Sequence, residues 1–159
     1  MITGNYNEMT SIEESQSKRY SKNEYVNYRN FTSQFLTKIY PHGLRFFSSN
    51  YHPIPHWNSG AQMISLNYQT NSNPMWMNRA LFETNGSCGY VLKPEHIINP
   101  DFVAYPTRRC ILSITVLCAF NLTTLDNEII NPYVEIRIFG CRKYKRSRFT
   151  TRTITNNGT

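Results

Sequence analysis

The first part of the chain alternates between polar stretches and short hydrophobic runs. Residues 1–34 are mostly polar, and their few hydrophobic positions give only thin apolar faces. Within them, S-x-x-E patterns at 11–14 and 21–24 fit capping boxes. In a capping box, a serine and a glutamate three residues later satisfy free backbone amides at a helix N-terminus. The two patterns predict two short helices that pack onto a larger structure.

Hydrophobic runs of strand length follow, separated by residues that are typical of turns. They predict strands over residues 35–40, 62–68 and 89–93, and a short helix near 55–59. The Asn-Ser-Asn-Pro run at 71–74 predicts a loop, because these residues favour turns. The pattern thus indicates a mixture of short strands and helices in this part of the chain.

The pattern changes after Pro94, where strands are predicted without helices between them. Residues 110–117 form a strongly hydrophobic run, and residues 152–155 give a short strand near the end of the chain. Residues 133–139 alternate hydrophobic and polar side chains with period two, which is typical of a half-buried antiparallel strand. Three strands with loop breaks indicate the start of a β-sandwich.

Charge is distributed unevenly along the 159 residues, which carry 17 Lys and Arg against 10 Asp and Glu, a net charge of +7. Residues 1–104 contribute +1 of this charge and residues 105–159 contribute +6. The second segment is therefore the candidate for contact with an anionic surface, either lipid headgroups or nucleic acid. A solvated basic face explains the same excess of charge equally well.

Three features of the composition bound the environment of the protein. No hydrophobic run approaches the length of a membrane span, so any membrane contact is expected to be peripheral. Residues 1–20 contain no apolar core of a signal peptide. The 4 cysteines show neither C-x-x-C spacing nor a dense framework, and we expect free thiols in a reducing compartment.

Several blocks of sequence follow one another in a distinctive order along residues 8–98. They are Lys38-Ile39-Tyr40-Pro41, Ser48-Ser49-Asn50-Tyr51, Trp57-Asn58-Ser59-Gly60-Ala61-Gln62, Met63-Ile64-Ser65-Leu66-Asn67-Tyr68-Gln69-Thr70 and the run 82–94. The residues of these blocks and their order resemble the Y-box, the second half of the catalytic barrel of phosphoinositide-specific phospholipase C. The tail resembles a C2 domain, because Asn131-Pro132-Tyr133-Val134 stands where C2 domains carry Asp-Pro-Tyr-Val.

The resemblance implies an α/β fold, the second half of a (β/α)8 TIM-like barrel followed by an incomplete all-β C2 sandwich. The implied domains are the Y-box over residues 1–98, a linker over 99–107 and the N-terminal part of a C2 domain over 108–159. Half a barrel and three sandwich strands leave core faces and strand edges unpaired. We therefore expect the chain to be a fragment of a larger protein, in which the X-box half completes the barrel.

The resemblance also implies a binding site for the inositol headgroup of a phosphoinositide lipid. The matching positions are Ser11, which would donate a hydrogen bond to a ring phosphate, Lys38, which would attract phosphate, and Tyr40, which would lie against the ring. Lys38 is a departure from the arginine of the family, because arginine offers a planar two-pronged donor and lysine only a point charge. Structural interpretations remain open: a helix cap for Ser11, a strand residue that reaches solvent for Lys38 and a core aromatic for Tyr40.

The function implied is calcium-dependent hydrolysis of phosphatidylinositol 4,5-bisphosphate to diacylglycerol and inositol 1,4,5-trisphosphate in intracellular signalling. In the family, the general base, the general acid and the Ca²⁺ ligands lie in the X-box, so no catalytic or metal-binding residue is assigned in this chain. The 4 histidines are expected in loops or at the surface. The isolated chain is expected to be inactive, and the whole protein is expected in the cytoplasm, peripheral at the inner membrane surface.

The alternative is a catalytically inactive phospholipase-C-like scaffold that binds inositol phosphates. Lys38 favours this alternative, and so does Phe47, which stands where the family usually has aspartate. An X-box with both catalytic histidines would decide for the enzyme, and an X-box without them would decide for the scaffold. Asn131 replaces an aspartate of the C2 calcium loop, so calcium binding by the tail is not expected.

A basic run follows the predicted strand over 133–139. Its five cations are Arg142, Lys143, Lys145, Arg146 and Arg148. Because the tail resembles a lipid-binding module, we expect an anionic membrane surface as its partner, with roughly 1 kcal/mol from each cation near the surface. A solvated hairpin loop is the alternative interpretation. Nucleic acid is not expected as a partner, because the run lacks a fold context of that kind.

Overall fold

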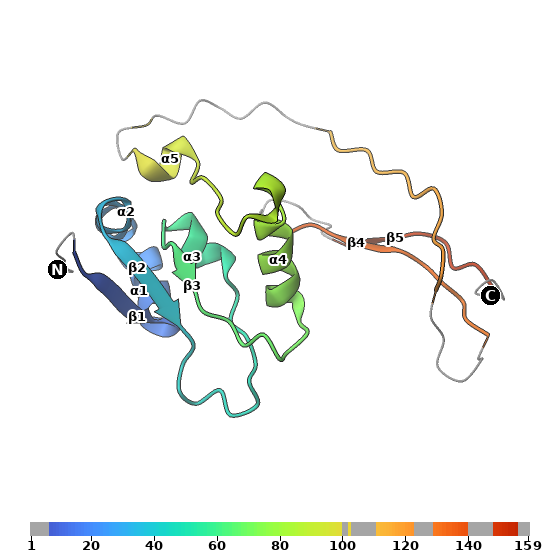
Figure 1. Cartoon of the computed structure of the whole chain (residues 1–159), viewed down its shortest axis with the longest axis horizontal. Helices are drawn as coiled ribbons and strands as arrows, with labels where there is room; N and C mark the ends of the chain where they lie inside the picture. Colours follow the sequence, from blue (N-terminus) through green and yellow to red (C-terminus); the bar gives the residue numbers. More distant parts are fainter. Residues whose placement is uncertain (1–6, 100–101, 103–110, 123–128, 140–147, 156–159) are drawn as a thin grey trace. The chain divides into compact units, whose positions relative to one another are not determined.

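The chain forms two compact units, Met1–Pro106 and Thr107–Thr159, which are described separately. The computed structural model describes residues 7–99, 102, 111–122, 129–139 and 148–155 (Figure 1). In these residues the first unit combines a parallel sheet with helices, and the second unit contains a two-stranded antiparallel sheet.

A three-stranded parallel sheet organises the first unit, in the order β1 (Met9–Glu13), β2 (Leu36–Tyr40) and β3 (Met63–Ile64). β2 confirms the strand predicted over 35–40. No strand was predicted over β1, because Ser11–Glu14 was assigned to a capping box at the start of a helix. β1 pairs with β2 along its whole length, so its strand conformation is fixed by a partner that lies more than twenty residues away in the chain.

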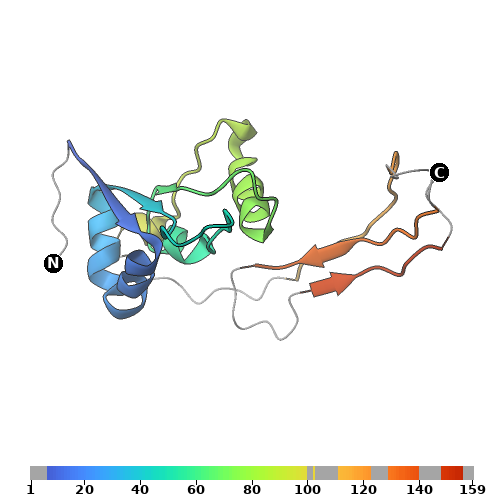
Figure 2. The same ribbon diagram turned by 90° about the horizontal axis from the view of Figure 1, so that it is seen from below.

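Two helices, α1 (Glu14–Asn23) and α2 (Tyr25–Gln34), connect β1 to β2 and confirm the two helices predicted within residues 1–34. Figures 1 and 2 show both helices on the same face of the sheet, as a β-α-β connection between neighbouring parallel strands requires. α1 packs against both strands and against α2. Charged and polar side chains cover the outer surface of α1, which explains its low hydrophobicity.

The capping boxes predicted at the starts of these helices are wrong. Ser11 lies inside β1, and the N-cap of α1 is Glu13, whose carboxylate accepts a hydrogen bond from the Ser15 amide at 2.9 Å. Ser21 lies within α1, where its hydroxyl donates to the Ser17 carbonyl. Pairing of β1 with β2 therefore overrides a local signal that places the helix start two residues earlier.

Short helices joined by loops make up the rest of the described first unit. They are α3 (Ile54–Asn58), α4 (Asn73–Phe82), the 3-10 turn Asn85–Ser87 and α5 (Glu95–Ile98). α3 confirms the helix predicted near 55–59. α4 was not expected, and the loop predicted over 71–74 is wrong at its end. Pro74 stands in the first turn of α4, where its missing amide costs no helical hydrogen bond.

Two predicted strands of the first unit differ from the structure. In the run 62–68, only Met63–Ile64 forms a strand, because the Asn67 amide donates to the Asn50 side chain at 2.7 Å instead of to a neighbouring strand. The run 89–93 is not a strand, and its Tyr90 and Leu92 side chains are exposed. No strand in the described part of the chain lies beside it to receive its hydrogen bonds.

The hydrophobic core lies between the sheet and its helices. Ile12 and Ile39, paired in register on β1 and β2, are buried together with Tyr28 of α2. Tyr51 and Ala61, which lie between β2 and β3 in the sequence, complete the cluster. Because side chains alternate along a strand, this core row places the neighbouring residues of β1 and β2 on the opposite face of the sheet.

The second unit contains two short antiparallel strands, β4 (Glu135–Arg137) and β5 (Arg148–Thr150). β4 confirms the centre of the strand predicted over 133–139. The strand predicted over 152–155 is wrong in position, although the Ile154 amide still donates to the Pro132 carbonyl at 3.0 Å. Pro132 has no amide to return a hydrogen bond, which interrupts the ladder beyond β5.

The strand predicted over 110–117 is not formed in its described residues, 111–117. Their hydrophobic side chains remain exposed, most strongly at Ile111 and Leu117. A hydrophobic run becomes a strand only where another strand accepts its hydrogen bonds, and the described residues provide none here. Cys88 and Cys118 are free, as predicted, and both are exposed; the other two cysteines lie outside the described residues.

Candidate functional site

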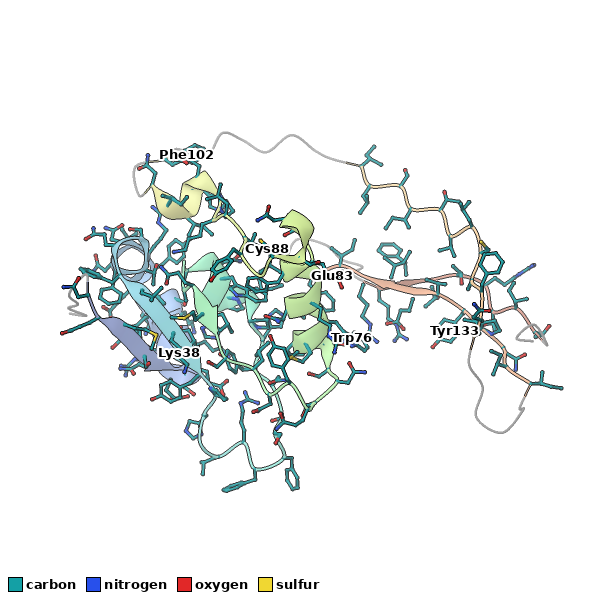
Figure 3. All side chains as sticks on the ribbon, viewed as in Figure 1. Lys38, Trp76, Glu83, Cys88, Phe102 and Tyr133 are labelled. Carbon is teal, nitrogen blue, oxygen red and sulfur yellow. The ribbon has the colours of Figure 1, made fainter. Side chains whose placement is uncertain are left out.

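The three residues predicted to bind a headgroup lie on one face of the sheet. Ser11 of β1 and Lys38 of β2 are paired in register, and Tyr40 follows Lys38 by two residues on the same face. Figure 3 shows Lys38 on the sheet. Helices α1 and α2 cover the opposite face, so Ser11 and Tyr40 remain exposed and Lys38 is half-buried. Of their structural interpretations, the helix cap is wrong for Ser11, and Tyr40 lies outside the core formed by the described residues.

Hydrophobic side chains share this open face of the sheet. Met9 and Leu36 are paired in register at its amino end, and they remain 47% and 48% exposed. Parallel sheets are normally covered on both faces. The open face is thus hydrophobic at the amino ends of the strands and polar toward their carboxyl ends, which is where ligands bind in parallel α/β folds.

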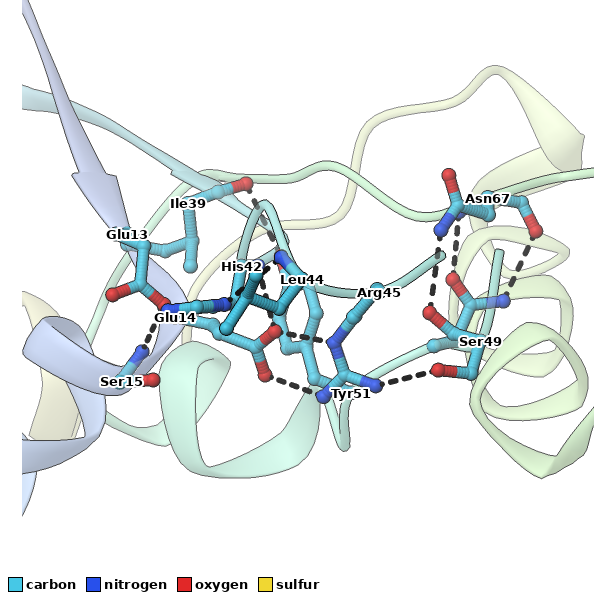
Figure 4. Close-up of polar contacts among 11 residues, drawn as sticks. Glu13, Glu14, Ser15, Ile39, His42, Leu44, Arg45, Ser49, Tyr51 and Asn67 are labelled. Carbon is cyan, nitrogen blue, oxygen red and sulfur yellow. Dashed lines mark hydrogen bonds and ion pairs between the residues drawn. The ribbon is translucent and has the colours of Figure 1, made fainter. Parts of the chain in front are cut away.

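An ion pair ties the carboxyl ends of β1 and β2 together (Figure 4). Glu14 follows β1 directly, and its carboxylate accepts hydrogen bonds from Nε and Nη2 of Arg45, the Nη2 bond at 2.7 Å. The same carboxylate accepts the His42 amide at 2.8 Å. Burial raises the pKa of Glu14, but the hydrogen bonds from Arg45 and His42 outweigh it and hold the pKa below its usual range. The pair therefore stays ionised at neutral pH.

Further contacts hold the β2–α3 loop (residues 41–53), which contains Arg45. The Tyr51 hydroxyl donates to the Ile39 carbonyl at 3.1 Å, and the Arg45 guanidinium lies 5.9 Å from the centre of the Tyr51 ring. Asn50 exchanges hydrogen bonds with the backbone of Asn67, on the segment that follows β3. The loop is thus fixed to β2 and to the segment that follows β3 by its own side chains, as Figure 4 shows.

The tip of the β2–α3 loop carries exposed hydrophobic side chains. Leu44, Phe46 and Phe47 are 68%, 80% and 95% exposed. Arg45, which lies among them in the sequence, turns inward to Glu14 and leaves its hydrophobic neighbours outside. Large aromatic side chains at this exposure are a typical sign of a surface that meets a partner or a membrane.

A buried serine–histidine contact lies elsewhere in the first unit. The Ser17 hydroxyl stands 2.7 Å from Nδ1 of His56 and 2.8 Å from the Tyr28 hydroxyl. Such a pair resembles an activated nucleophile, but Ser17 and His56 are 0% and 3% exposed, so no substrate reaches them. The group is structural. His56 corrects the expectation that every histidine lies in a loop or at the surface, because it occupies a buried position of α3.

The described residues contain no group of three or more His, Cys, Asp or Glu side chains that could hold a metal ion. No helix in the described ranges has both the length and the hydrophobicity needed to cross a membrane. Of the predicted basic run, Arg142, Lys143, Lys145 and Arg146 lie outside the described residues. Arg148 lies in β5 and forms an ion pair with Glu135 of β4.

Sequence reasoning predicted roles for the strand residues Lys38 and Tyr40, but it did not predict the ion pair between Glu14 and Arg45 that the structure places beside them. Glu14 was assigned to a capping box, and no role was predicted for Arg45. One signal was present in the sequence: Arg45 is a single charged residue between Leu44 and Phe46, and a lone cation in a hydrophobic segment often has a buried partner.

Comparison with known proteins identifies the family of this fold. The family model "Phosphatidylinositol-specific phospholipase C, Y domain" matches residues 2–96. The 1-phosphatidylinositol 4,5-bisphosphate phosphodiesterase gamma plc-3 of Caenorhabditis elegans is 40% identical over 139 residues, which are 80% of this chain and 10% of the relative. The beta-4 phosphodiesterase of Bos taurus is 39% identical over 156 residues, 94% of this chain and 15% of the relative.

A solved structure agrees with these relatives. The crystal structure of S. officinalis PLC21 matches 96% of this chain with a TM-score of 0.63 and 30% sequence identity, and the match covers 20% of that chain. The chain thus spans between a tenth and a fifth of the proteins that it resembles. The resemblance found from the sequence blocks is confirmed, and the chain belongs to the family of the phosphatidylinositol-specific phospholipase C Y domain.

Proposed function

We propose that this chain is the headgroup-recognising half of a phosphoinositide phospholipase C. One observation is central: Ser11, Lys38 and Tyr40 lie together on the open face of the sheet, toward the carboxyl ends of the strands. The reaction is that of the relatives, whose names describe phosphodiesterases of phosphatidylinositol 4,5-bisphosphate. The first unit would be the second half of a (β/α)8 barrel, and the second unit would be the start of a C2 sandwich.

The proposed roles follow from side-chain chemistry. Lys38 would supply a positive charge to a ring phosphate, and Ser11, its in-register neighbour, a hydroxyl donor to a phosphate oxygen. Tyr40 would place its aromatic face against the carbon face of the inositol ring. Among the described residues no acidic side chain forms an ion pair with Lys38, so its charge is available to a ligand.

Bond cleavage itself would depend on the X half of the barrel. Hydrolysis through a cyclic phosphate needs a general base, a general acid and a cation for the charge on the reacting phosphate. The residues described in this chain do not fit a Ca²⁺ ion, because they contain no cluster of carboxylates, so the calcium ligands would belong to the X half. The open, partly hydrophobic face at Met9 and Leu36 supports a second half-barrel as the partner.

Peripheral attachment at the inner membrane surface is part of the proposal. The exposed loop tip at Leu44, Phe46 and Phe47 supports it, because a lipid substrate must be reached where its headgroup meets the hydrocarbon. Each phenylalanine that enters the hydrocarbon contributes roughly 1.5–3 kcal/mol. The basic run from Arg142 to Arg148 would add attraction to anionic lipid.

The test uses the full chain co-expressed with the X half of the Bos taurus relative, hereafter the reconstituted complex. It is expected to bind inositol 1,4,5-trisphosphate in calorimetry and to hydrolyse phosphatidylinositol 4,5-bisphosphate, whereas the chain alone hydrolyses none. Lys38→Ala and Tyr40→Ala should each weaken trisphosphate binding about tenfold or more, a loss of about 1.4 kcal/mol. Lys22→Ala and Tyr90→Ala remove an exposed lysine and tyrosine elsewhere and serve as matched controls. Equal effects of all four variants would refute the assigned roles.

The same experiment addresses the alternative function, an inactive scaffold that binds inositol phosphates. Lys38 favours this alternative, because a lysine cannot offer the bidentate geometry of a guanidinium to phosphate. The scaffold predicts headgroup binding without hydrolysis when this chain is joined to an active X half. Hydrolysis by the reconstituted complex would show that this half supports catalysis. The X-box of the whole protein then decides between the two functions: both catalytic histidines decide for the enzyme, and their loss decides for the scaffold.

A further inference from the structure

We propose that Glu14 and Arg45 are positioning residues for headgroup recognition, because their ion pair fixes the end of β2 that carries Lys38 and Tyr40. This inference rests on the function proposed for that strand. Glu14 is buried, and the Arg45 guanidinium is turned to its carboxylate, so both would act through the strand end and not by touching the ligand.

The geometry places the pair immediately behind the proposed site. Tyr40 is the last residue of β2, and the chain leaves the strand through Pro41 and His42. The His42 amide is held by the Glu14 carboxylate, and Glu14 is the first residue after β1. One carboxylate therefore links the end of β1 to the second residue after Tyr40, across the two strands that carry the proposed site.

A second contact holds the strand end from the other side. The Tyr51 hydroxyl donates to the Ile39 carbonyl, directly before Tyr40, and the Tyr51 ring lies beside the Arg45 guanidinium. The backbone of residues 39–42 is thus bound on both sides of Tyr40, at Ile39 and at His42. Arg45 joins the two contacts, since it binds Glu14 and faces Tyr51 (Figure 4).

The buried position of the carboxylate makes the arrangement sensitive to change. Glu14 is only 9% exposed, so its charge depends on Arg45 and on the His42 amide in place of water. Without Glu14, Arg45 loses its inward partner and the chain after Tyr40 loses its tie to β1. We expect the Tyr40 ring to sample positions away from the ligand, and binding groups misplaced by about 1 Å lose much of their effect.

The test compares variants of the pair in the reconstituted complex, with affinity for inositol 1,4,5-trisphosphate and melting temperature measured together. Glu14→Gln and Arg45→Gln should each weaken affinity about tenfold. Arg45→Lys keeps the charge and should restore most of the affinity. The double variant Glu14→Gln/Arg45→Gln should be no weaker than either single variant, because one pair is lost in all three.

Thr32→Val is the matched control for stability. Thr32 is buried, and its hydroxyl donates to the Ser59 carbonyl at 2.6 Å, between α2 and α3 and away from the open face. This variant should lower the melting temperature and leave the affinity unchanged. If Glu14→Gln behaves in the same way, the pair is only structural and the inference is overturned.

Three other results would also overturn the inference. A rise in affinity in Glu14→Gln would mean that the released Arg45 binds phosphate itself. A wild-type complex that does not bind the trisphosphate at all would refute the proposed function of Lys38 and Tyr40, and the positioning role with it. Normal wild-type binding that is insensitive to the pair overturns the positioning role alone.

Discussion

Acidification to pH 5 should weaken the first unit through His56. This imidazole is 3% exposed, its Nδ1 lies 2.7 Å from the Ser17 hydroxyl, and its ring meets the Tyr51 ring edge-on at 5.2 Å. Burial, with smaller contributions from His52 and Lys18, lowers the pKa of His56 to about 4, although Glu14 acts in the opposite direction. The neutral ring is therefore the form that the fold accepts.

The sign and size of the effect follow from proton linkage. The unfolded chain binds a proton at the ordinary pKa of about 6.5, and the folded chain only near 4. Stability from this residue is fully present above the unfolded value and falls as the pH drops below it. For a single group with these pKa values, the free energy of unfolding falls by about 2 kcal/mol between pH 7 and pH 5. Glu14 acts below this window, because the stability that comes from its lowered pKa is lost only as the pH falls through the acidic range.

Urea unfolding of the full chain between pH 5 and pH 7.5 measures this effect. Tryptophan fluorescence reports the first unit alone, because the 2 tryptophans of the chain, Trp57 and Trp76, both lie there. His56→Asn keeps a polar partner for Ser17 but cannot titrate, so the loss between pH 7 and pH 5 should shrink by about 2 kcal/mol. His52→Asn is the matched control, because His52 is an exposed histidine four residues away whose pKa partial desolvation also lowers. A pH dependence that survives His56→Asn unchanged would refute the reasoning.

Three other changes test the remaining parts of the structure. Lys38→Arg should tighten trisphosphate binding by the reconstituted complex about threefold to tenfold in calorimetry, since a guanidinium binds phosphate with two donors. Gly60→Ala should lower the free energy of unfolding in urea by about 1–3 kcal/mol, because Gly60 has φ +88° and a Cβ there would lie 2.5 Å from Thr32 Oγ1. Phe46→Ser/Phe47→Ser should reduce sedimentation with phosphatidylserine vesicles at least tenfold, from the loss of roughly 1.5–3 kcal/mol per inserted ring, and leave trisphosphate affinity unchanged.

Prediction from the sequence succeeded where local and tertiary preferences agree. β2 has hydrophobic residues of strand length that end before Pro41, and its burial in the sheet follows the same pattern. α3 also follows from its local sequence, with Pro53 and Pro55 at its start. β1 was not predicted because it is short and mostly polar. Only its pairing with β2 makes this segment a strand. Propensity cannot contain that information, since the partner lies far away in the sequence.

The candidate site shows the same division. The roles of Ser11, Lys38 and Tyr40 were predicted from the family resemblance, and the register of β1 and β2 places the three residues on one face. Their neighbours Glu14 and Arg45 are 31 residues apart and belong to no local pattern, so only the structure shows their ion pair. Exposed hydrophobic runs, such as 111–117, misled the prediction because hydrophobicity alone does not supply a hydrogen-bonding partner.

The two faces of the sheet are linked by its register, and this limits how the site can change. Ile12 and Ile39 anchor the core row, so a slip of β1 by one residue would bury Ser11 and expose Ile12. The loss of that buried isoleucine alone, at about 2–5 kcal/mol for comparable truncations, makes such a slip unfavourable. The packing of one face therefore holds Ser11 beside Lys38 on the other, and under the proposed function headgroup preference would vary through the identity of these side chains.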